Sequence, residues 1–433
     1  MYFYDFNFKE YSLGTKLDFS SNKYNIINYF EYGISEPEDG FAWTSENEIE
    51  LSFNFVDDVQ VIVGSFDLLT VYNESQNVKI YVNDIVAFDE TIKESECVEK
   101  KINFIFSKPF DGKVKIRLIL NDAISPYELS ESEDKRKLSL CIKSLVFERC
   151  EVNSISSQKK ISFLKNEQNF LPYLISGVSS AESIGAWTDA KQVMFAFNFE
   201  NKQECLMFFD AKLSAINNDS QNVQIFANDV LVFHDEVASL DGIKFYFVVP
   251  RTKIVFIRIL LKNAFSPKSF NVSEDVRLLG LMFQSISFSE VKLVSYELNT
   301  MLNAIKNDFS VKPYIFSGLS IPEKDYTWAD GKRLLFGAKI EDYKANQSLK
   351  CKVFLGGVMR ETQRVSILVF GIPVFFGNID SSITEIDFDI PPLGNDNLVI
   401  EFFMLDATSP HSENSQDEDK RLLSLRVKSI IIE

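Results

Sequence analysis

Hydrophobic and polar residues alternate over short segments of this chain, and turn-forming residues separate the segments. The β-rich runs 78–82 and 85–88 flank Asn83-Asp84, and a matching pair of runs flanks Asn228-Asp229. Two turn-forming residues between β-rich runs predict a tight antiparallel hairpin. The other apolar runs are equally short and end at Asn, Asp, Ser, Gly or Pro, so the chain is predicted to be built from short strands.

Three sequence blocks recur in the same order, which indicates duplication of a whole domain. The first block contains the only tryptophans, which lie 144 and 141 residues apart: Trp43, Trp187 and Trp328. It reads GISEPEDGFAWTS from Gly33, GVSSAESIGAWTD from Gly177 and GLSIPEKDYTWAD from Gly318. The second block reads SQNVKIYVND, SQNVQIFAND and TQRVSILVFG, from Ser75, Ser220 and Thr362. The third reads DAISPYELSESEDKRKLSL, NAFSPKSFNVSEDVRLLGL and DATSPHSENSQDEDKRLLSL, from Asp122, Asn263 and Asp406.

The repeat is too long for a solenoid unit and has the size of an independent domain. We therefore predict three tandem domains at 1–150, 151–292 and 293–433. A short linker helix is expected at the start of the third, because apolar residues behind a Ser295 cap have helical spacing: Leu298, Met301, Leu302 and Ile305. Seven or eight β-rich runs in each copy are typical of an antiparallel β-sandwich, and we favour a jelly roll over an immunoglobulin-like sandwich.

Composition narrows the choice of partners. Of the 433 residues, 45 are Lys or Arg and 62 are Asp or Glu, which gives a net charge of −17. So acidic a chain argues against binding to nucleic acid or anionic lipid, because both depend on basic surfaces. The N-terminus lacks the pattern of a secretory signal and no apolar run is long enough to span a membrane, so a cytoplasmic protein is expected.

Charged residues recur in the third block as Asp-x-Arg. The pairs are Asp134 with Arg136, Asp275 with Arg277 and Asp419 with Arg421, and the first block supplies Glu38, Glu182 and Glu323 as further acids. A guanidinium that enters a strand on its apolar side needs a carboxylate partner or an exit to solvent. The set permits two interpretations: a structural ion pair that ties a loop to a strand, which we favour, or part of a site for sugar hydroxyls.

The tryptophans and a set of glutamines are also ambiguous. Exposed, Trp43, Trp187 and Trp328 would serve as platforms for a sugar ring, whereas buried they would anchor a loop in the core, and we favour the core. Gln76, Gln221 and Gln363 precede strands and are candidates to orient a ligand, although satisfying loop backbone groups is the simpler role.

Catalytic signals are weak. His234 and His411 occupy non-equivalent positions, no cysteine and histidine cluster has metal-binding spacing, and the nucleophile and phosphate-loop motifs are missing. We therefore expect no catalytic residue, no metal site and no cofactor, although a carboxylate pair of the glycosidase type stays open. The five cysteines are scattered and odd in number, which is typical of reduced thiols.

Together the three blocks resemble a β-sandwich module associated with bacterial surface-polysaccharide biosynthesis, where it accompanies glycosyltransferase domains. The module's pattern is G-x-S-x-x-E-x-x-x-x-W-[ST]-D-G, then a V-x-V-x-[NG] hairpin, then D-A-x-S-P and S-x-D-x-R-x-L-G. The second copy matches it best, with Glu182, Trp187, Thr188, Asp189, Ser266, Pro267, Ser273, Asp275, Arg277, Leu279 and Gly280. Departures are Ser45 and Ser139 in the first copy, and Ala329 and Phe370-Gly371 in the third.

The resemblance implies an association with glycan metabolism, and no transferase domain accompanies the copies. The first hypothesis is a non-catalytic protein that binds glycan or glycan-assembly enzymes. The second is a structural or assembly protein whose sandwiches contact other protein subunits. A hydrolase with one carboxylate pair is a third.

Overall fold

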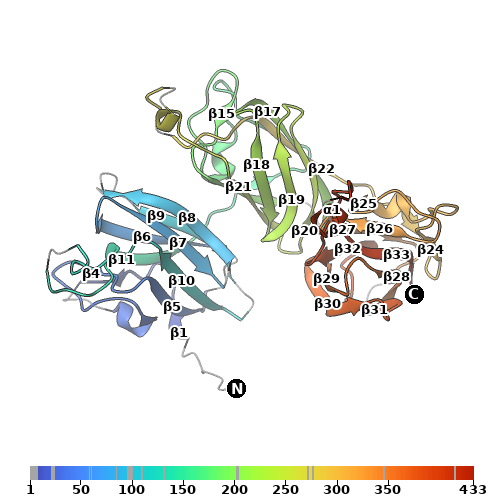
Figure 1. Cartoon of the computed structure of the whole chain (residues 1–433), viewed down its shortest axis with the longest axis horizontal. Helices are drawn as coiled ribbons and strands as arrows, with labels where there is room; N and C mark the ends of the chain where they lie inside the picture. Colours follow the sequence, from blue (N-terminus) through green and yellow to red (C-terminus); the bar gives the residue numbers. More distant parts are fainter. Residues whose placement is uncertain are drawn as a thin grey trace. The chain divides into compact units, whose positions relative to one another are not determined.

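The computed structural model describes residues 8–20, 25–57, 59, 61–83, 85–94, 101–108, 111–129, 132–200, 204–270, 273–275, 277–344, 347–413 and 416–433. The chain divides into two compact units, Met1–Glu151 and Val152–Glu433 (Figure 1). Nearly all regular structure in the described residues is β-strand, and the strands form six sheets.

The six sheets fall into three pairs with the same strand order, one pair in the first unit and two in the second. In the first pair, one sheet has the order β1-β5-β10-β7-β8 with β3 beside β5, and the other has the order β2-β11-β6-β9 with β4 beside β11. We call the three pairs the first, second and third sandwich. The long strands pass back and forth between the two sheets, as in a jelly roll. The predicted all-β class of jelly-roll-like sandwiches is confirmed, whereas the domain limits at 150 and 292 stay predictions.

The first sandwich contains β1 (Lys9–Tyr11), β2 (Leu17–Asp18), β3 (Phe30–Tyr32), β4 (Ala42–Trp43), β5 (Glu48–Phe55), β6 (Val61–Val71), β7 (Ser75–Val82), β8 (Ile85–Lys93), β9 (Lys101–Ser107), β10 (Lys113–Leu120) and β11 (Leu140–Arg149). The second contains β12 (Ser154–Ile155), β13 (Lys160–Ser162), β14 (Leu174–Ser176), β15 (Ala186–Trp187), β16 (Gln192–Phe199), β17 (Cys205–Ile216), β18 (Gln221–Ala227), β19 (Val230–Val237), β20 (Ile243–Val249), β21 (Ile254–Leu261) and β22 (Leu281–Glu290). The third contains β23 (Ser295–Tyr296), β24 (Leu302–Asn303), β25 (Ile315–Ser317), β26 (Thr327–Asp330), β27 (Arg333–Ile340), β28 (Leu349–Val358), β29 (Thr362–Val369), β30 (Ile372–Asp380), β31 (Glu385–Ile390), β32 (Asn397–Met404) and β33 (Leu423–Ile432).

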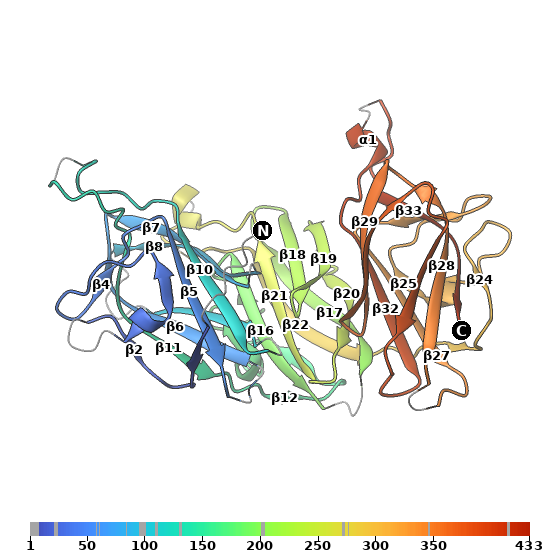
Figure 2. The same cartoon turned by 90° about the horizontal axis from the view of Figure 1, so that it is seen from below.

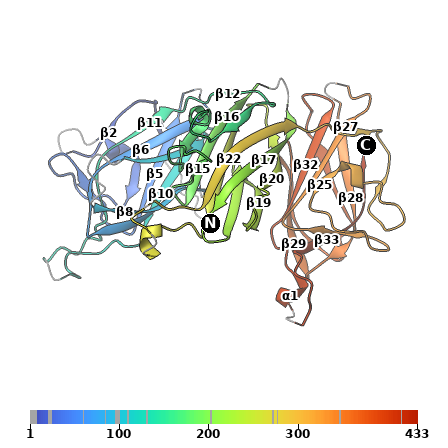
Figure 3. The same cartoon turned by 90° about the horizontal axis from the view of Figure 1, so that it is seen from above.

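Helical structure in the described residues is limited to short pieces. They are 3-10 turns at Ile26–Asn28, Leu171–Tyr173, Pro267–Phe270 and Lys312–Tyr314, and the single α-helical turn α1 (Pro410–Glu413). Figures 2 and 3 show α1 on a loop that extends past the strands of the third sandwich. None of the described helices is long and apolar enough to cross a membrane.

The predicted linker helix around residues 298–305 is wrong. This segment contains β24, which pairs with β33, and directly follows β23, which pairs with β27. Tyr296 and Leu302 are buried in the core of the third sandwich, whereas Met301 is exposed. The helical spacing of these apolar residues is coincidental, because pairing with neighbouring strands outweighs a weak local preference for helix.

Each sandwich has its own hydrophobic core between its sheets. In the first, Phe147 on the last strand makes edge-to-face contacts with Tyr11, Phe53 and Phe55, with ring centroids 4.8–5.2 Å apart. Phe288 occupies the same place in the second sandwich. By its register opposite the Trp strand, Ile432 is the equivalent residue of the third, so that core is more aliphatic there.

The incoming segment of a sandwich is fastened to its last strand. The Tyr11 hydroxyl donates to the Thr15 carbonyl and accepts from Phe147 N at 3.1 Å. Tyr296 repeats this with Thr300 at 2.6 Å and Ile432 N at 2.9 Å. Burial raises the pKa of both tyrosines to about 12, so the hydroxyls stay protonated and able to donate.

Cys141, Cys150 and Cys351 are free thiols. Cys141, Cys205 and Cys351 are buried and Cys150 is partly buried, whereas Cys97 lies outside the described residues. Burial is the main cause that raises the pKa of Cys141, Cys150 and Cys351, which makes these thiols poor nucleophiles.

Candidate functional site

Two grooves lie at the same place in the first and third sandwiches, where the first sequence block meets the third. The groove in the first sandwich has a volume of about 570 Å³ and includes Ser35, Ser45 and Arg136. The groove in the third has a volume of about 810 Å³ and includes Ser320, Asp330 and Arg421. Ser35 and Ser320 lie two positions after the glycine of the first block. Ser45 and Asp330 lie two positions after its tryptophan. We call these two grooves the Arg grooves. The second sandwich holds Ser179, Asp189 and Arg277 at the equivalent positions.

The glycine of the first block sets the backbone of this groove. Gly318 has φ +81°, and a Cβ atom there would lie 2.0 Å from the Arg333 carbonyl oxygen, so a larger residue cannot occupy the position. Its carbonyl accepts a hydrogen bond from Asp330 N at 3.0 Å. The same bond joins Gly33 to Ser45 at 2.9 Å. The recurrent glycine therefore fixes the residue that lines the groove.

A recurrent hydroxyl joins the first and third blocks. Thr44 Oγ1 accepts from Ser139 N at 3.2 Å and Leu140 N at 3.0 Å, and Thr188 makes the same pair of bonds in the second sandwich. The third sandwich has Ala329 at this position, and the hydroxyl comes instead from Ser424, which donates to the Ala329 carbonyl at 3.3 Å. The sequence departure at Ala329 is thus compensated from the opposite block.

The Asp-x-Arg pairs adopt the same geometry in all three sandwiches. The guanidinium uses Nε and Nη2 to bind the aspartate two residues earlier, with Nη2 to Oδ2 distances of 2.6–2.7 Å. The same carboxylate also accepts from the backbone N of the arginine at 2.9–3.0 Å. Both residues of each pair lie in the loop before the last strand, so the pair connects two residues of that loop and does not tie the loop to the strand. Whether it has a structural role or belongs to a site stays a prediction.

The ion pair leaves part of each arginine available. Among the described residues, no acceptor receives a hydrogen bond from Nη1 of Arg136 or Arg421, and both side chains are 43% exposed. An arginine held at one edge by a carboxylate is preorganised to donate from its other edge. A structural pair and a ligand contact are therefore compatible roles for the same residue.

The carboxylates around the arginines differ in electrostatics. In each Asp-x-Arg pair the hydrogen bonds from the guanidinium lower the pKa of the aspartate. By contrast, burial raises the pKa of Asp189 and of Asp330, although the neighbouring arginine opposes the shift. The three block-one glutamates are exposed: Glu182 approaches Arg277 Nη2 only at 3.9 Å, while the charges of Glu38 and Glu323 raise the pKa of Arg136 and Arg421 as minor contributions.

Replacing Asp330 with asparagine is expected to stabilise the protein modestly at pH 7. Because the folded pKa of Asp330 is raised, its contribution to stability is present below its unfolded pKa and is lost as the pH rises through the folded value. D330N has no charge to bury, so its advantage over the natural chain should be present at pH 7 and absent at about pH 3.5. Urea unfolding at both pH values measures this, and an equal advantage at both would show that charge burial is not the cause.

The three glutamines lie inside the sandwiches and outside the Arg grooves. Gln76 donates to the Tyr72 carbonyl and its Oε1 accepts from Ser139 Oγ at 2.7 Å. Gln221 donates to the Asn217 carbonyl at 2.7 Å, but its Oε1 has no partner among the residues that the structure describes, because Gly280 stands where the first sandwich has Ser139. Gln363 donates to the Arg364 carbonyl at 3.0 Å. Gln76 and Gln221 thus bind loop carbonyls, whereas Gln363 binds a carbonyl within β29, and a ligand-orienting role for the three stays a prediction.

The tryptophans stand on the outer face of a sheet. Trp43 is opposite Cys141, Trp187 opposite Met282 and Trp328 opposite Arg426 in the register of the last strand. Directly opposed residues share a face, and none of the three tryptophans belongs to a core cluster of the described residues. Trp328 is only 6% exposed. The Arg426 guanidinium lies over the Trp328 ring, with its carbon 4.7 Å from the ring centroid. The tryptophans do not line the Arg grooves, and their platform role stays a prediction.

Several groove residues are not shared by all three copies. The third Arg groove also includes Lys306, Phe309, Phe316 and Ile321, of which Ile321 is 83% exposed. Lys135 and Lys137 line the first. A comparison of the copies misses Phe309, Phe316, Ile321 and Lys137 because these residues differ between the copies, whereas Lys135 recurs as Lys420 and Lys306 as Lys165. The high exposure of Ile321 is visible only in the structure. No cluster of three or more metal-binding side chains occurs in the described ranges.

Comparison with known proteins gives no family. No protein-family model matches the sequence, and no curated protein sequence matches it. The chain is similar to the structure described as the triple jelly roll fold and turret assembly of an archaeal virus, with 9% identity, 98% of this chain and 97% of that chain covered, and a TM-score of 0.27.

Carbohydrate-binding modules are also among the similar structures. The tandem CBM22 domains of Paenibacillus barcinonensis Xyn10C show 11% identity over 60% of this chain and 93% of theirs, with a TM-score of 0.20. The module CBM36 in complex with calcium and xylotriose shows 14% identity over 31% of this chain and 99% of its own, with a TM-score of 0.19. At these scores the similarity carries no functional conclusion, and function is inferred from the Arg grooves.

Proposed function

We propose that this protein binds glycans through its Arg grooves, without catalysing a reaction on them. The observation that carries the proposal is the free Nη1 edge of Arg136 and Arg421, each held in place by an aspartate and each beside a serine in a groove of several hundred Å³. Sugars present pairs of hydroxyls that a fixed guanidinium and nearby hydroxyl or carboxylate oxygens can bind together.

The third Arg groove has the fuller set of groups for such a ligand. Asp330 supplies a partly buried acceptor next to the Arg421 donor, and Ile321 with Phe316 supplies an apolar surface. A sugar ring has one apolar face and a polar rim, which matches that combination. The first groove has Ser45 and Glu36 at the corresponding positions, so the two grooves should prefer different glycans.

The resemblance of the sequence blocks to a polysaccharide-associated module supports glycans as the ligand class. We extend the proposal to a role in bacterial surface-polysaccharide metabolism, in the cytoplasm, where the protein would hold a glycan chain or present it to assembly enzymes. Binding in separate sandwiches would raise the overall affinity for a long chain through multivalency.

A glycan-array screen followed by calorimetry with the strongest glycan tests the proposal. The double variant R136Q/R421Q should weaken binding by about tenfold or more, because it removes the donors that the ligand would use. R364Q is the matched control: Arg364 binds Asp406 through the same backbone and guanidinium contacts but lies outside the grooves. Unchanged affinity in the double variant, or equal losses in both proteins, would refute the Arg grooves as the site.

A further inference from the structure

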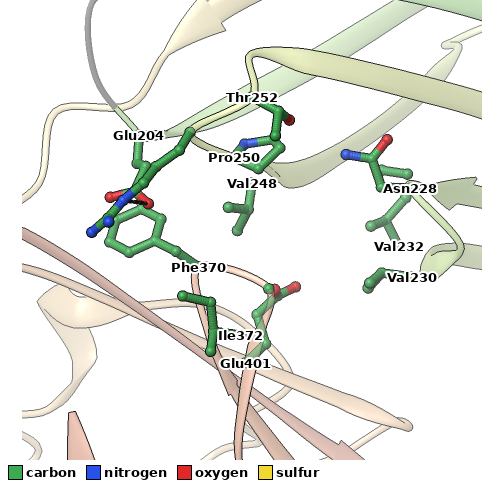
Figure 4. Close-up of a pocket in the computed structure, with 13 residues that line it drawn as sticks. Glu204, Asn228, Val230, Val232, Val248, Pro250, Thr252, Phe370, Ile372 and Glu401 are labelled. Atoms are coloured by element: carbon green, nitrogen blue, oxygen red, sulfur yellow. Dashed lines mark hydrogen bonds and ion pairs between the residues drawn. The ribbon is translucent and has the colours of Figure 1, made fainter. Parts of the chain in front are cut away.

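A pocket of about 340 Å³ lies within the second compact unit, between the second and third sandwiches. Its apolar walls come from both, with Val230, Val248 and Pro250 on one side and Phe370 and Ile372 on the other (Figure 4). We call it the interface pocket. Its volume is in the range of small-molecule sites, which favour domain interfaces.

Two arginines hold the walls of the interface pocket together. Arg333 of the third sandwich binds Glu401 and donates through Nη1 to the Tyr246 carbonyl of the second at 2.9 Å. Arg251 of the second sandwich binds Glu204 at 2.8 Å and donates to the Pro392 carbonyl of the third at 2.8 Å. The rings of Tyr246 and Phe316 add an edge-to-face contact at 5.4 Å. The pocket therefore has a fixed frame made by reciprocal contacts.

One wall of the pocket is under backbone strain. Phe370 has φ +47°, a conformation that bulky residues rarely adopt, followed by Gly371 at φ +79°. The equivalent turn in the second sandwich is Asn228-Asp229, which suits such angles. Strained residues persist where the surroundings over-determine them, often at ligand sites. The departure from the repeat at Phe370 thus supplies an apolar wall that the ordinary turn residues would not.

The buried polar groups with unused capacity in the interface pocket are carboxylate acceptors, whereas the polar lining residues Arg251 and Thr252 are exposed. Glu401 is 2% exposed and takes both contacts from Arg333 on Oε1, so Oε2 accepts no hydrogen bond from the described residues. Glu204, 4% exposed, likewise has Oε1 bound to Arg251, and no donor in the described part of the chain reaches its Oε2. The Asn228 amide is used by its own turn, with bonds to the Ile254 carbonyl and Phe256 N.

From this arrangement we infer that the interface pocket binds a small, mostly apolar molecule with one uncharged hydrogen-bond donor, which binds the free oxygen of Glu401. The two glutamates are already balanced by two arginines, so a cation gains little net attraction and an anion would face carboxylate oxygens in a desolvated site. An uncharged hydroxyl satisfies Oε2 without adding charge. The inference is independent of glycan binding in the Arg grooves.

Calorimetry on the full chain with three related probes tests the inference. We expect 2-naphthol to bind with 1:1 stoichiometry, and 2-methoxynaphthalene, which lacks the donor, and anionic 2-naphthoate to bind about tenfold more weakly or worse. No binding of 2-naphthol, or binding of 2-naphthoate as tight as that of 2-naphthol, would overturn it.

Pocket-filling variants locate the bound probe. V230F should reduce 2-naphthol affinity by about tenfold or more, whereas L231F, the next residue on the same strand with its side chain on the opposite face, should leave it unchanged. I372W fills the pocket from the third sandwich and keeps the test decisive if V230F folds poorly. Full affinity in a folded V230F or I372W protein would place the probe elsewhere and refute the site.

Discussion

Replacing Arg333 with alanine is expected to lower the free energy of unfolding of the unit Val152–Glu433 by about 3–5 kcal/mol. The variant leaves the Glu401 carboxylate buried without its charge partner and also removes the hydrogen bond to the Tyr246 carbonyl in the second sandwich. Urea unfolding followed by peptide-resolved hydrogen exchange measures the loss separately from the unit Met1–Glu151.

A matched control lies on the same strand. Lys339 pairs with Asp396 at 3.3 Å, but both side chains are about half exposed, so K339A should cost under about 1 kcal/mol. The double variant R333M/E401L should recover much of the stability, because no charge is left buried without a partner. Similar losses for R333A and K339A would show that Glu401 is not a buried charge that depends on Arg333.

Replacing Phe147 with alanine should cost the unit Met1–Glu151 about 3–5 kcal/mol. The ring lies at the centre of an aromatic cluster and contacts five other rings, so its removal opens a cavity that the two sheets cannot close. Hydrogen exchange in peptides from this unit should rise while exchange in the other unit stays the same.

The control for Phe147 comes from the protein itself. F147I introduces the residue type that Ile432 provides at the same place in the third sandwich, and should cost clearly less than F147A. If F147A lost under about 1 kcal/mol, the aromatic cluster would not be the main source of stability in the first sandwich.

Tight turns could be predicted from the sequence, because their backbone conformation restricts which residue types can occupy them. Asn228-Asp229 between two β-rich runs predicted the hairpin of β18 and β19, and both residues have positive φ. The short strands could not be predicted from the sequence. For example, β23 and β24 form because they pair with β27 and β33, which lie later in the chain. Local spacing at Leu302 instead suggested a helix.

The candidate sites also differ in how much of each could be predicted from the sequence. Arg136 and Arg421 could be found because the copies repeat them, and the pairing with an aspartate two residues earlier follows from the spacing alone. The sequence could not predict that each arginine keeps one edge free, because this depends on the angle at which the carboxylate approaches the guanidinium. The interface pocket has no repeated signal at all: its walls join non-equivalent parts of two copies, Val248 from a strand and Phe370 from a turn.

The hydrogen bonds of Tyr11 and Tyr296 to the last strands have a consequence for how such a chain can gain domains in evolution. Because Tyr11 and Tyr296 fasten the incoming segment to the last strand, the chain leaves a sandwich close to where it entered. Neighbouring ends are the condition under which a domain can be inserted, deleted or copied without disturbing its own packing. An array of this kind can gain a unit by unequal recombination, and each copy can then change separately, as at Phe370, where the third copy departs from the Asn-Asp turn of the other two.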